Sequence, residues 1–245
     1  MKINSTDSVK EYKIKVLING LSGSGKTTQV TKIQAAGYKP LVVSFESGLL
    51  SIAGHKIDYV DGTRDDGGVL IPKELRIDRL MDIYRYILSE DSKKKYDTIY
   101  LDSLTEICQC MYDALKKEYP ERKDSLVLYG ELSQKMRSLI QAFRDIPYYH
   151  VVFTCLSKIE KDEFGKRYVG YDLIGSIADK VTQYYDESFY LRVNGEGQRE
   201  FICQATDTVI AKDRSSKLKP VEMADLGAIF NTILMKGQEN AIRPN

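Results

Sequence analysis

The chain has 245 residues, of which 42% are hydrophobic and 29% charged, and its formal net charge is +1. This length is enough for one well-packed domain, and the balanced charge excludes binding of nucleic acid through a global basic field. No apolar run reaches the length of a membrane span, and residues 1–7 lack the apolar core of a signal peptide. A cytoplasmic protein without membrane contact is therefore expected.

Cysteine and histidine usage gives no sign of a metal centre. Cys108, Cys110, Cys155 and Cys203 show no C-x-x-C or zinc-type spacing, so we expect reduced, structural cysteines. The two histidines lie far apart in the sequence, at positions 55 and 150, and we expect both to be structural.

A glycine-rich segment follows the first predicted strand, at residues 13–19. Residues 20–27 read Gly-Leu-Ser-Gly-Ser-Gly-Lys-Thr and fit the phosphate-binding pattern G-x-x-x-x-G-K-[ST] at every fixed position. A helix is predicted directly after it, with Gly37 as its stop. The candidate nucleotide-binding residues are Gly20, Leu21, Ser22, Gly23, Ser24, Gly25, Lys26, Thr27 and Thr28.

The chemistry of such a loop is specific. Glycines let backbone N–H groups approach phosphate oxygens closely, and the helix that follows directs its positive end at the same oxygens. We expect Lys26 to reach the β- and γ-phosphates of ATP and Thr27 to ligate Mg²⁺. The alternative is an ordinary Gly/Ser turn before a helix.

Strands and helices alternate along the rest of the chain, which predicts a mostly parallel α/β sheet flanked by helices. An antiparallel extension is expected near the C-terminus. The predicted strands are 41–45, 57–60, 98–101, 150–155, 189–193, 201–205 and one ending near 212, and the predicted helices are 74–88, 103–119, 130–145, 174–184 and 224–235. One domain is expected at 12–236, between an N-terminal segment, 1–11, and a mobile tail, 237–245.

Two acids follow predicted strands. Asp102 ends the buried run 98–102, where a P-loop protein holds its Mg²⁺ ion; the alternative is an aspartate that caps the next helix. Glu46 follows the strand 41–45, at the sheet edge where ligands of α/β proteins bind. Its carboxylate could deprotonate the water that attacks the γ-phosphorus, whereas the alternative is a solvated turn residue.

A pair of cations, Lys212 and Arg214, follows a β-rich run. Residues at alternate positions of an extended segment point the same way, so both cations could meet one γ-phosphate. A solvated basic loop is the alternative.

The order of these motifs resembles the RecA-like ATPase core, and most of all the phage-encoded RecA-like ATPases of single-strand annealing and recombination. The resemblance covers residues 12–230. It implies a general base at Glu46, and Lys212 and Arg214 acting across a subunit boundary in a homo-oligomer. It also implies a polar sensor after strand 151–153, for which Thr154 is the candidate and Ser157 the second choice. RecA carries an amide side chain near that place, and this chain does not.

The resemblance places DNA against the loop that follows the sensor strand, here residues 157–171. This loop alternates cations, which suit phosphates, with aromatic rings, which stack on unpaired bases. The candidate contacts are Lys158, Lys161, Phe164, Lys166, Arg167 and Tyr168. Acids at positions 160, 162 and 163 dilute the charge, and an ordinary surface β-hairpin is the alternative.

The sequence thus predicts a Mg²⁺-dependent ATPase that binds single-stranded DNA in phage recombination, annealing or replication, within the cytoplasm of a bacterial host. A single-strand-binding protein is a further expected partner. One alternative is a P-loop kinase of a small metabolite, although no arginine-rich lid is visible. The other is a nucleotide-gated binding module with little turnover.

Overall fold

A computed structural model describes residues 12–46, 48–122, 126–161 and 163–239. Within them, ten strands form one sheet. The strands are β1 (Lys15–Gly20), β2 (Pro40–Ser44), β3 (Asp58–Asp61), β4 (Thr98–Asp102), β5 (His150–Lys161), β6 (Arg167–Tyr171), β7 (Glu187–Val193), β8 (Arg199–Ile202), β9 (Lys212–Asp213) and β10 (Val221–Met223).

The sheet is mostly parallel, as the alternation of elements predicts. Its order is β10-β8-β7-β1-β5-β4-β2-β3, with β6 paired to β5 and β9 to β7. The strands from β3 to β7 in this order run parallel, whereas β8 and β10 extend the sheet antiparallel. This arrangement confirms the predicted fold class, including its antiparallel C-terminal extension.

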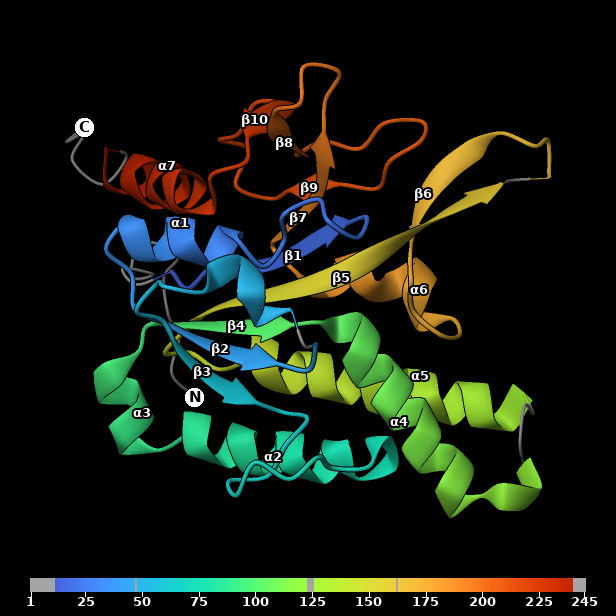
Figure 1. Ribbon diagram of the computed structural model, residues 1–245. Helices are drawn as coiled ribbons and strands as arrows, with labels where there is room; N and C mark the ends of the chain where they lie inside the picture. The colour runs from blue at the N-terminus through green and yellow to red at the C-terminus, as the bar shows by residue number, and fades with distance from the viewer. Residues whose placement is uncertain (1–11, 47, 123–125, 162, 240–245) are drawn as a thin grey trace, which may run out of the picture.

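Helices cover both faces of the sheet, with α2, α4 and α5 on one face and α1 and α7 on the other (Figure 1). The α-helices are α1 (Gln29–Ala35), α2 (Arg76–Ile87), α3 (Glu90–Lys95), α4 (Leu104–Glu118), α5 (Leu126–Arg144), α6 (Ile177–Lys180) and α7 (Leu226–Glu239). Short 3-10 helices occur at η2 (Leu49–Ile52), η3 (Lys73–Leu75), η4 (Pro120–Arg122) and η5 (Val181–Tyr184).

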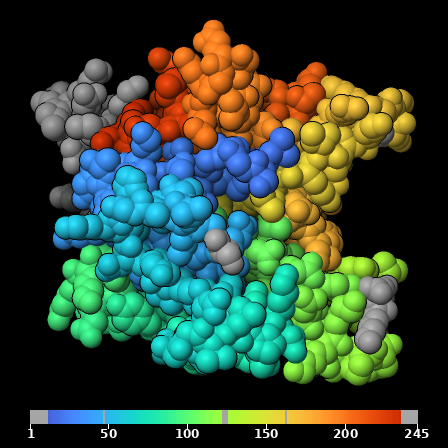
Figure 2. All heavy atoms as spheres, viewed as in Figure 1, coloured from blue at the N-terminus to red at the C-terminus, as the bar shows by residue number. Residues whose placement is uncertain are grey.

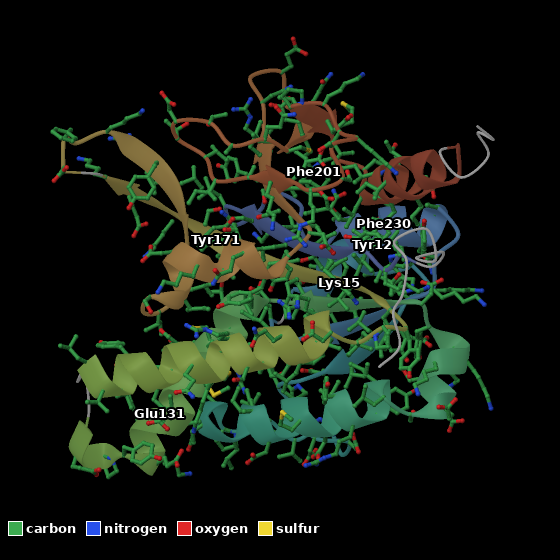
Figure 3. All side chains as sticks on the ribbon, turned by 180° about the vertical axis from the view of Figure 1, so that it is seen from behind. Tyr12, Lys15, Glu131, Tyr171, Phe201 and Phe230 are labelled. Atoms are coloured by element: carbon green, nitrogen blue, oxygen red, sulfur yellow. The ribbon has the colours of Figure 1, made fainter. Side chains whose placement is uncertain are left out.

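Alternation of side chains along the central strands divides the core in two. Leu17 of β1 packs with the α2, α4 and α5 side, whereas Val16 and Ile18 pack with α1 and α7. All three are fully buried. Figure 3 shows the same division from behind, with Phe230 of α7 on one side of the sheet and Glu131 of α5 on the other. Because both faces are covered, these strands read as continuous apolar runs.

The structure differs from the sequence predictions at several boundaries. The predicted strand 150–155 continues to Lys161, because its second half pairs antiparallel with β6. The predicted helix 174–184 is a short α6 followed by the 3-10 helix η5. Helix α3 was not predicted, since its six polar residues have no apolar periodicity; Ser89 caps it by accepting the N–H of Ser92.

The C-terminal elements also differ from the prediction. The strand expected to end near Lys212 begins there instead, and β10 was not predicted. Helix α7 includes residues 237–239, which the sequence assigns to the tail, while 1–11 and 240–245 lie outside the described residues. In the described ranges, none of the helices combines the length and apolarity needed to cross a bilayer.

The cysteines and His150 have the structural positions expected of them. All four cysteines are buried and free. The Nδ1 atom of His150 accepts the backbone N–H of Ile14 at 3.0 Å, and its ring lies against Tyr38 and Phe230. Burial, together with the nearby charges of Lys13 and Lys15, lowers the pKa of His150 to about 3, and burial is the largest cause.

This histidine predicts a loss of stability in acid. The pKa of His150 is lower in the folded state than in the unfolded state. The folded state is therefore favoured above about pH 6.5, and this contribution to stability is lost as pH falls toward about 3. The free energy of unfolding should fall by up to about 1.4 kcal/mol per pH unit in this window. His150→Asn keeps an acceptor for Ile14 and should remove this dependence. Urea unfolding at neutral and acidic pH measures it, with the exposed His55→Asn as control; an unchanged slope in His150→Asn would contradict the assignment.

Candidate nucleotide-binding site

The glycine-rich loop joins the end of β1 to the start of α1. Gly23 and Gly25 adopt φ angles of 77° and 100°, in the left-handed region that favours glycine. The N–H of Ser24 donates to the carbonyl of Leu21 at 3.2 Å, and a helical turn begins at Lys26, whose carbonyl accepts the N–H of Gln29 at 3.0 Å. The segment is thus a compact loop that leads directly into a helix, as a phosphate cradle requires.

Close packing at the start of the loop requires glycine. A Cβ on Gly20 would lie 2.7 Å from the carbonyl oxygen of Leu191 and 2.6 Å from Oγ of Ser24. The Ser24 hydroxyl is buried and has no hydrogen-bond partner within the described residues. This buried hydroxyl could donate a hydrogen bond to a phosphate oxygen of a ligand bound in the loop.

Lys26 is buried beneath the loop. Its ammonium donates to the carbonyls of Gly20 and Leu21, at 2.8 and 3.0 Å, and the hydroxyl of Tyr100 donates to the Lys26 carbonyl at 2.6 Å. Burial lowers the pKa of Lys26, while the carboxylates of Glu46 and Asp102 oppose this shift. The loop therefore holds its cation in place by backbone contacts and by two nearby acids.

Thr27, Asp102 and Thr154 meet across three elements. The Thr27 hydroxyl donates to Oδ2 of Asp102 at 2.7 Å, and the Thr154 hydroxyl donates to Oδ1 of the same carboxylate. The meeting follows from the sheet order, because β5 lies between β1 and β4. Asp102 is only 2% exposed, and hydroxyl groups donate to both of its carboxylate oxygens. The carboxylate is therefore held in a site that is largely dry.

Glu46 lies beside this group. Its backbone N–H donates to the carbonyl of Asp102 at 3.3 Å, and the Ser103 hydroxyl donates to its carboxylate. Burial raises the pKa of Glu46 and Asp102 raises it further, whereas Ser103 and Lys26 lower it. A half-buried carboxylate with a raised pKa suits a group that accepts a proton near neutral pH.

Ser103 is a site residue that sequence reasoning missed. The sequence predicts only the start of a helix at this residue, and its hydroxyl does accept the N–H of Glu106 at 3.4 Å as a cap. The same hydroxyl orients Glu46. A serine directly after Asp102 was the only available signal, and it does not distinguish the two roles.

The residues present fit a magnesium ion bound together with a triphosphate. Thr27 and Asp102 offer hydroxyl and carboxylate oxygens, the ligands that Mg²⁺ prefers, with their oxygens 2.7 Å apart. No cluster of three or more His, Cys, Asp or Glu side chains suited to a metal occurs in the described residues. Mg²⁺ needs none, because it binds through one or two protein ligands, substrate phosphates and water.

Lys212 and Arg214 do not lie in this site. Lys212 pairs with Ser188 near the start of β7, and the start of β7 pairs with the start of β1, whereas the loop follows the end of β1. The Lys212 ammonium donates to the carbonyl of Tyr185 at 2.6 Å. The guanidinium of Arg214 pairs with Asp186 at 2.9 Å, and its side chain is 58% exposed. The two cations therefore lie at the opposite edge of the sheet from the chain's own loop.

The predicted DNA-binding segment is a β-hairpin formed by the end of β5 and by β6. It stands out from the body at the loop edge of the sheet (Figure 2), where the Ser157 hydroxyl donates to Oδ1 of Asn19 at 2.6 Å. Phe164 is 86% exposed. Lys158 pairs with Glu160 at 2.8 Å and Lys166 with Asp207 at 3.3 Å. These acids therefore neutralise part of the positive charge of the hairpin. Lys161, Arg167 and Tyr168 complete the predicted set on the same hairpin, and Asp162 lies outside the described residues.

Comparison with known proteins agrees with this geometry. The model of a family described as an AAA domain matches residues 12–215, most of the chain. Two curated nucleotide-binding proteins of Clostridium botulinum, from strains Eklund 17B and Alaska E43, are each 27% identical over 137 residues. The match covers 53% of this chain and 43% of each relative, so the chain spans less than half the length of these proteins. With its P-loop, Thr27, Asp102 and Glu46 in one site, the chain belongs to the AAA domain family of P-loop nucleotide-binding proteins.

Proposed function

We propose that the protein is a Mg²⁺-dependent ATPase with a RecA-like core that binds single-stranded DNA in phage recombination, annealing or replication. The observation that carries the proposal is the convergence of Lys26, Thr27, Asp102 and Glu46 at one edge of the sheet. A cytoplasmic site of action and a single-strand-binding partner belong to the same proposal.

In this mechanism Lys26 binds the β- and γ-phosphates and stabilises charge that develops on them. Glu46, oriented by Ser103, holds the attacking water and takes its proton at a carboxylate oxygen. Thr27 and Asp102 would hold Mg²⁺, which when bound neutralises phosphate charge. Thr154 fixes the Asp102 carboxylate and so connects the site to β5, whose continuation forms the hairpin.

Support for a DNA partner comes from this hairpin. Strand β5 runs from Thr154 in the site to Lys161 in the hairpin, so nucleotide and DNA would act on two ends of one strand. The exposed ring of Phe164 and the cations Lys161 and Arg167 suit stacking and phosphate contacts with a single strand.

Steady-state phosphate release with Mg·ATP, with and without single-stranded DNA, tests the proposal, with duplex DNA of the same length as control. Stimulation by the single strand alone is expected. Transfer of phosphate to a small metabolite would support the kinase alternative instead. Tight binding of ATP without turnover would support the nucleotide-gated binding module.

The proposal includes completion of each site by the neighbouring subunit. Arg214 is exposed at the sheet edge remote from its own loop, and therefore open to a neighbour. Arg214→Ala and Glu46→Gln should each be inactive alone. An equal mixture should recover about a quarter of the wild-type rate, since a head-to-tail contact then pairs an intact Glu46 with an intact Arg214 in that share of sites. Phosphate release measures the recovery, and a mixture as inactive as its components would contradict completion across subunits.

A further inference from the structure

We propose that Arg199 of β8 is a positioning residue of the phosphate-binding loop, which fixes the Ser24–Gly25 peptide before nucleotide binds. The inference rests on the proposed function of the loop. Sequence reasoning gave Arg199 no role, since it follows a hairpin turn and lies 175 residues from Ser24.

The contact between Arg199 and the loop is close and directional. Nε of Arg199 donates to the carbonyl oxygen of Ser24 at 3.1 Å. The side chain also occupies the space beside Gly25, where a Cβ would lie 2.7 Å from Nε and 2.9 Å from Cδ of Arg199. The absence of a side chain at Gly25 thus serves two purposes, a φ of 100° and the approach of this arginine.

The backbone of Arg199 is held from both sides. Arg199 pairs with Val193 of β7, and its carbonyl accepts the N–H of Ala224 at 3.1 Å. Strand β7 in turn pairs with β1, which ends at the loop. The side chain therefore extends from a rigid part of the sheet to the segment between two glycines with positive φ.

This arrangement has an energetic consequence. A glycine-rich loop loses much conformational freedom when it closes on phosphates. A hydrogen bond from a guanidinium that already restrains the Ser24 carbonyl reduces that loss, and Arg199, an exposed residue, adds positive charge beside the loop. The contact forms before the reaction and persists through it, so its removal should raise KM and leave kcat unchanged.

The test compares Arg199→Ala with Arg192→Ala. Arg192 lies on the same hairpin, but its guanidinium pairs with Glu200 at 2.6 Å. Arg199→Ala should weaken binding of Mg·ATP, Mg·ADP and Mg·tripolyphosphate alike, by about tenfold, because a hydrogen bond from a charged donor is lost. Arg192→Ala should bind all three as the wild type does. Hydrogen exchange at the loop, residues 21–27, should become faster in Arg199→Ala without nucleotide.

Conservative variants separate the outcomes. Arg199→Lys keeps the positive charge and one donor, so it should recover part of the affinity for Mg·ATP. If Arg199→Ala folds poorly, the same measurements are made on Arg199→Lys. Wild-type affinity and loop exchange in Arg199→Ala would overturn the inference. A loss confined to kcat with ATP would also overturn it, because that pattern indicates direct contact in the transition state. If the wild type itself binds no Mg·ATP, the proposed function fails instead.

Discussion

Replacement of Lys26 by alanine is expected to weaken Mg·ATP binding about 100-fold, since two charge-assisted phosphate contacts are lost at roughly 1.5 kcal/mol each. The ammonium lies beneath the loop, with its donors directed at the carbonyls of Gly20 and Leu21. Calorimetric titration with Mg·ATP measures the loss.

Lys32→Ala is the matched control for this variant. Lys32 lies in the last turn of α1, the same helix that the loop leads into, and it is exposed. Its removal changes the net charge by the same amount and should leave affinity unchanged. If Lys26→Ala binds Mg·ATP as tightly as Lys32→Ala does, the loop is not a phosphate site and the proposed ATPase fails with it.

Replacement of Glu46 by glutamine is expected to leave Mg·ATP affinity within a few-fold of the wild type and to reduce kcat by about 10² to 10⁴. Glutamine has nearly the same shape and can still accept the hydrogen bond from Ser103, but it cannot take a proton from water. Single-turnover hydrolysis separates the chemical step from binding. The exposed Glu90→Gln serves as the control.

The raised pKa of Glu46 also predicts how ATPase activity changes at acidic pH. Glu46 must be ionised to act as a base, so activity should fall as pH decreases through its pKa. Burial raises that pKa, and the decline should therefore begin at a higher pH than an ordinary glutamate would give. Full activity of Glu46→Gln, or a kcat that stays constant through this range, would remove Glu46 from the mechanism.

The local pattern of the sequence was sufficient for the fold and for the parts of the site at strand ends. Buried strands such as 98–102 read as continuous apolar runs, and their alternation with helices predicts a parallel sheet. In such a sheet the residues after each strand gather at one edge, which is why Asp102, Glu46 and the glycine loop could be placed together. The structure brings these three together, while their catalytic roles stay predictions.

Other features depend on contacts between residues far apart in the chain, and no local pattern encodes them. The bond from Ser103 to Glu46 and the placement of Lys212 and Arg214 at the remote sheet edge follow from strand order and register. Arg199 is the clearest case, since its partner lies 175 residues earlier. Periodicity and turn chemistry act over a few residues, so they determine which elements form; the packing of those elements alone decides which distant side chains meet.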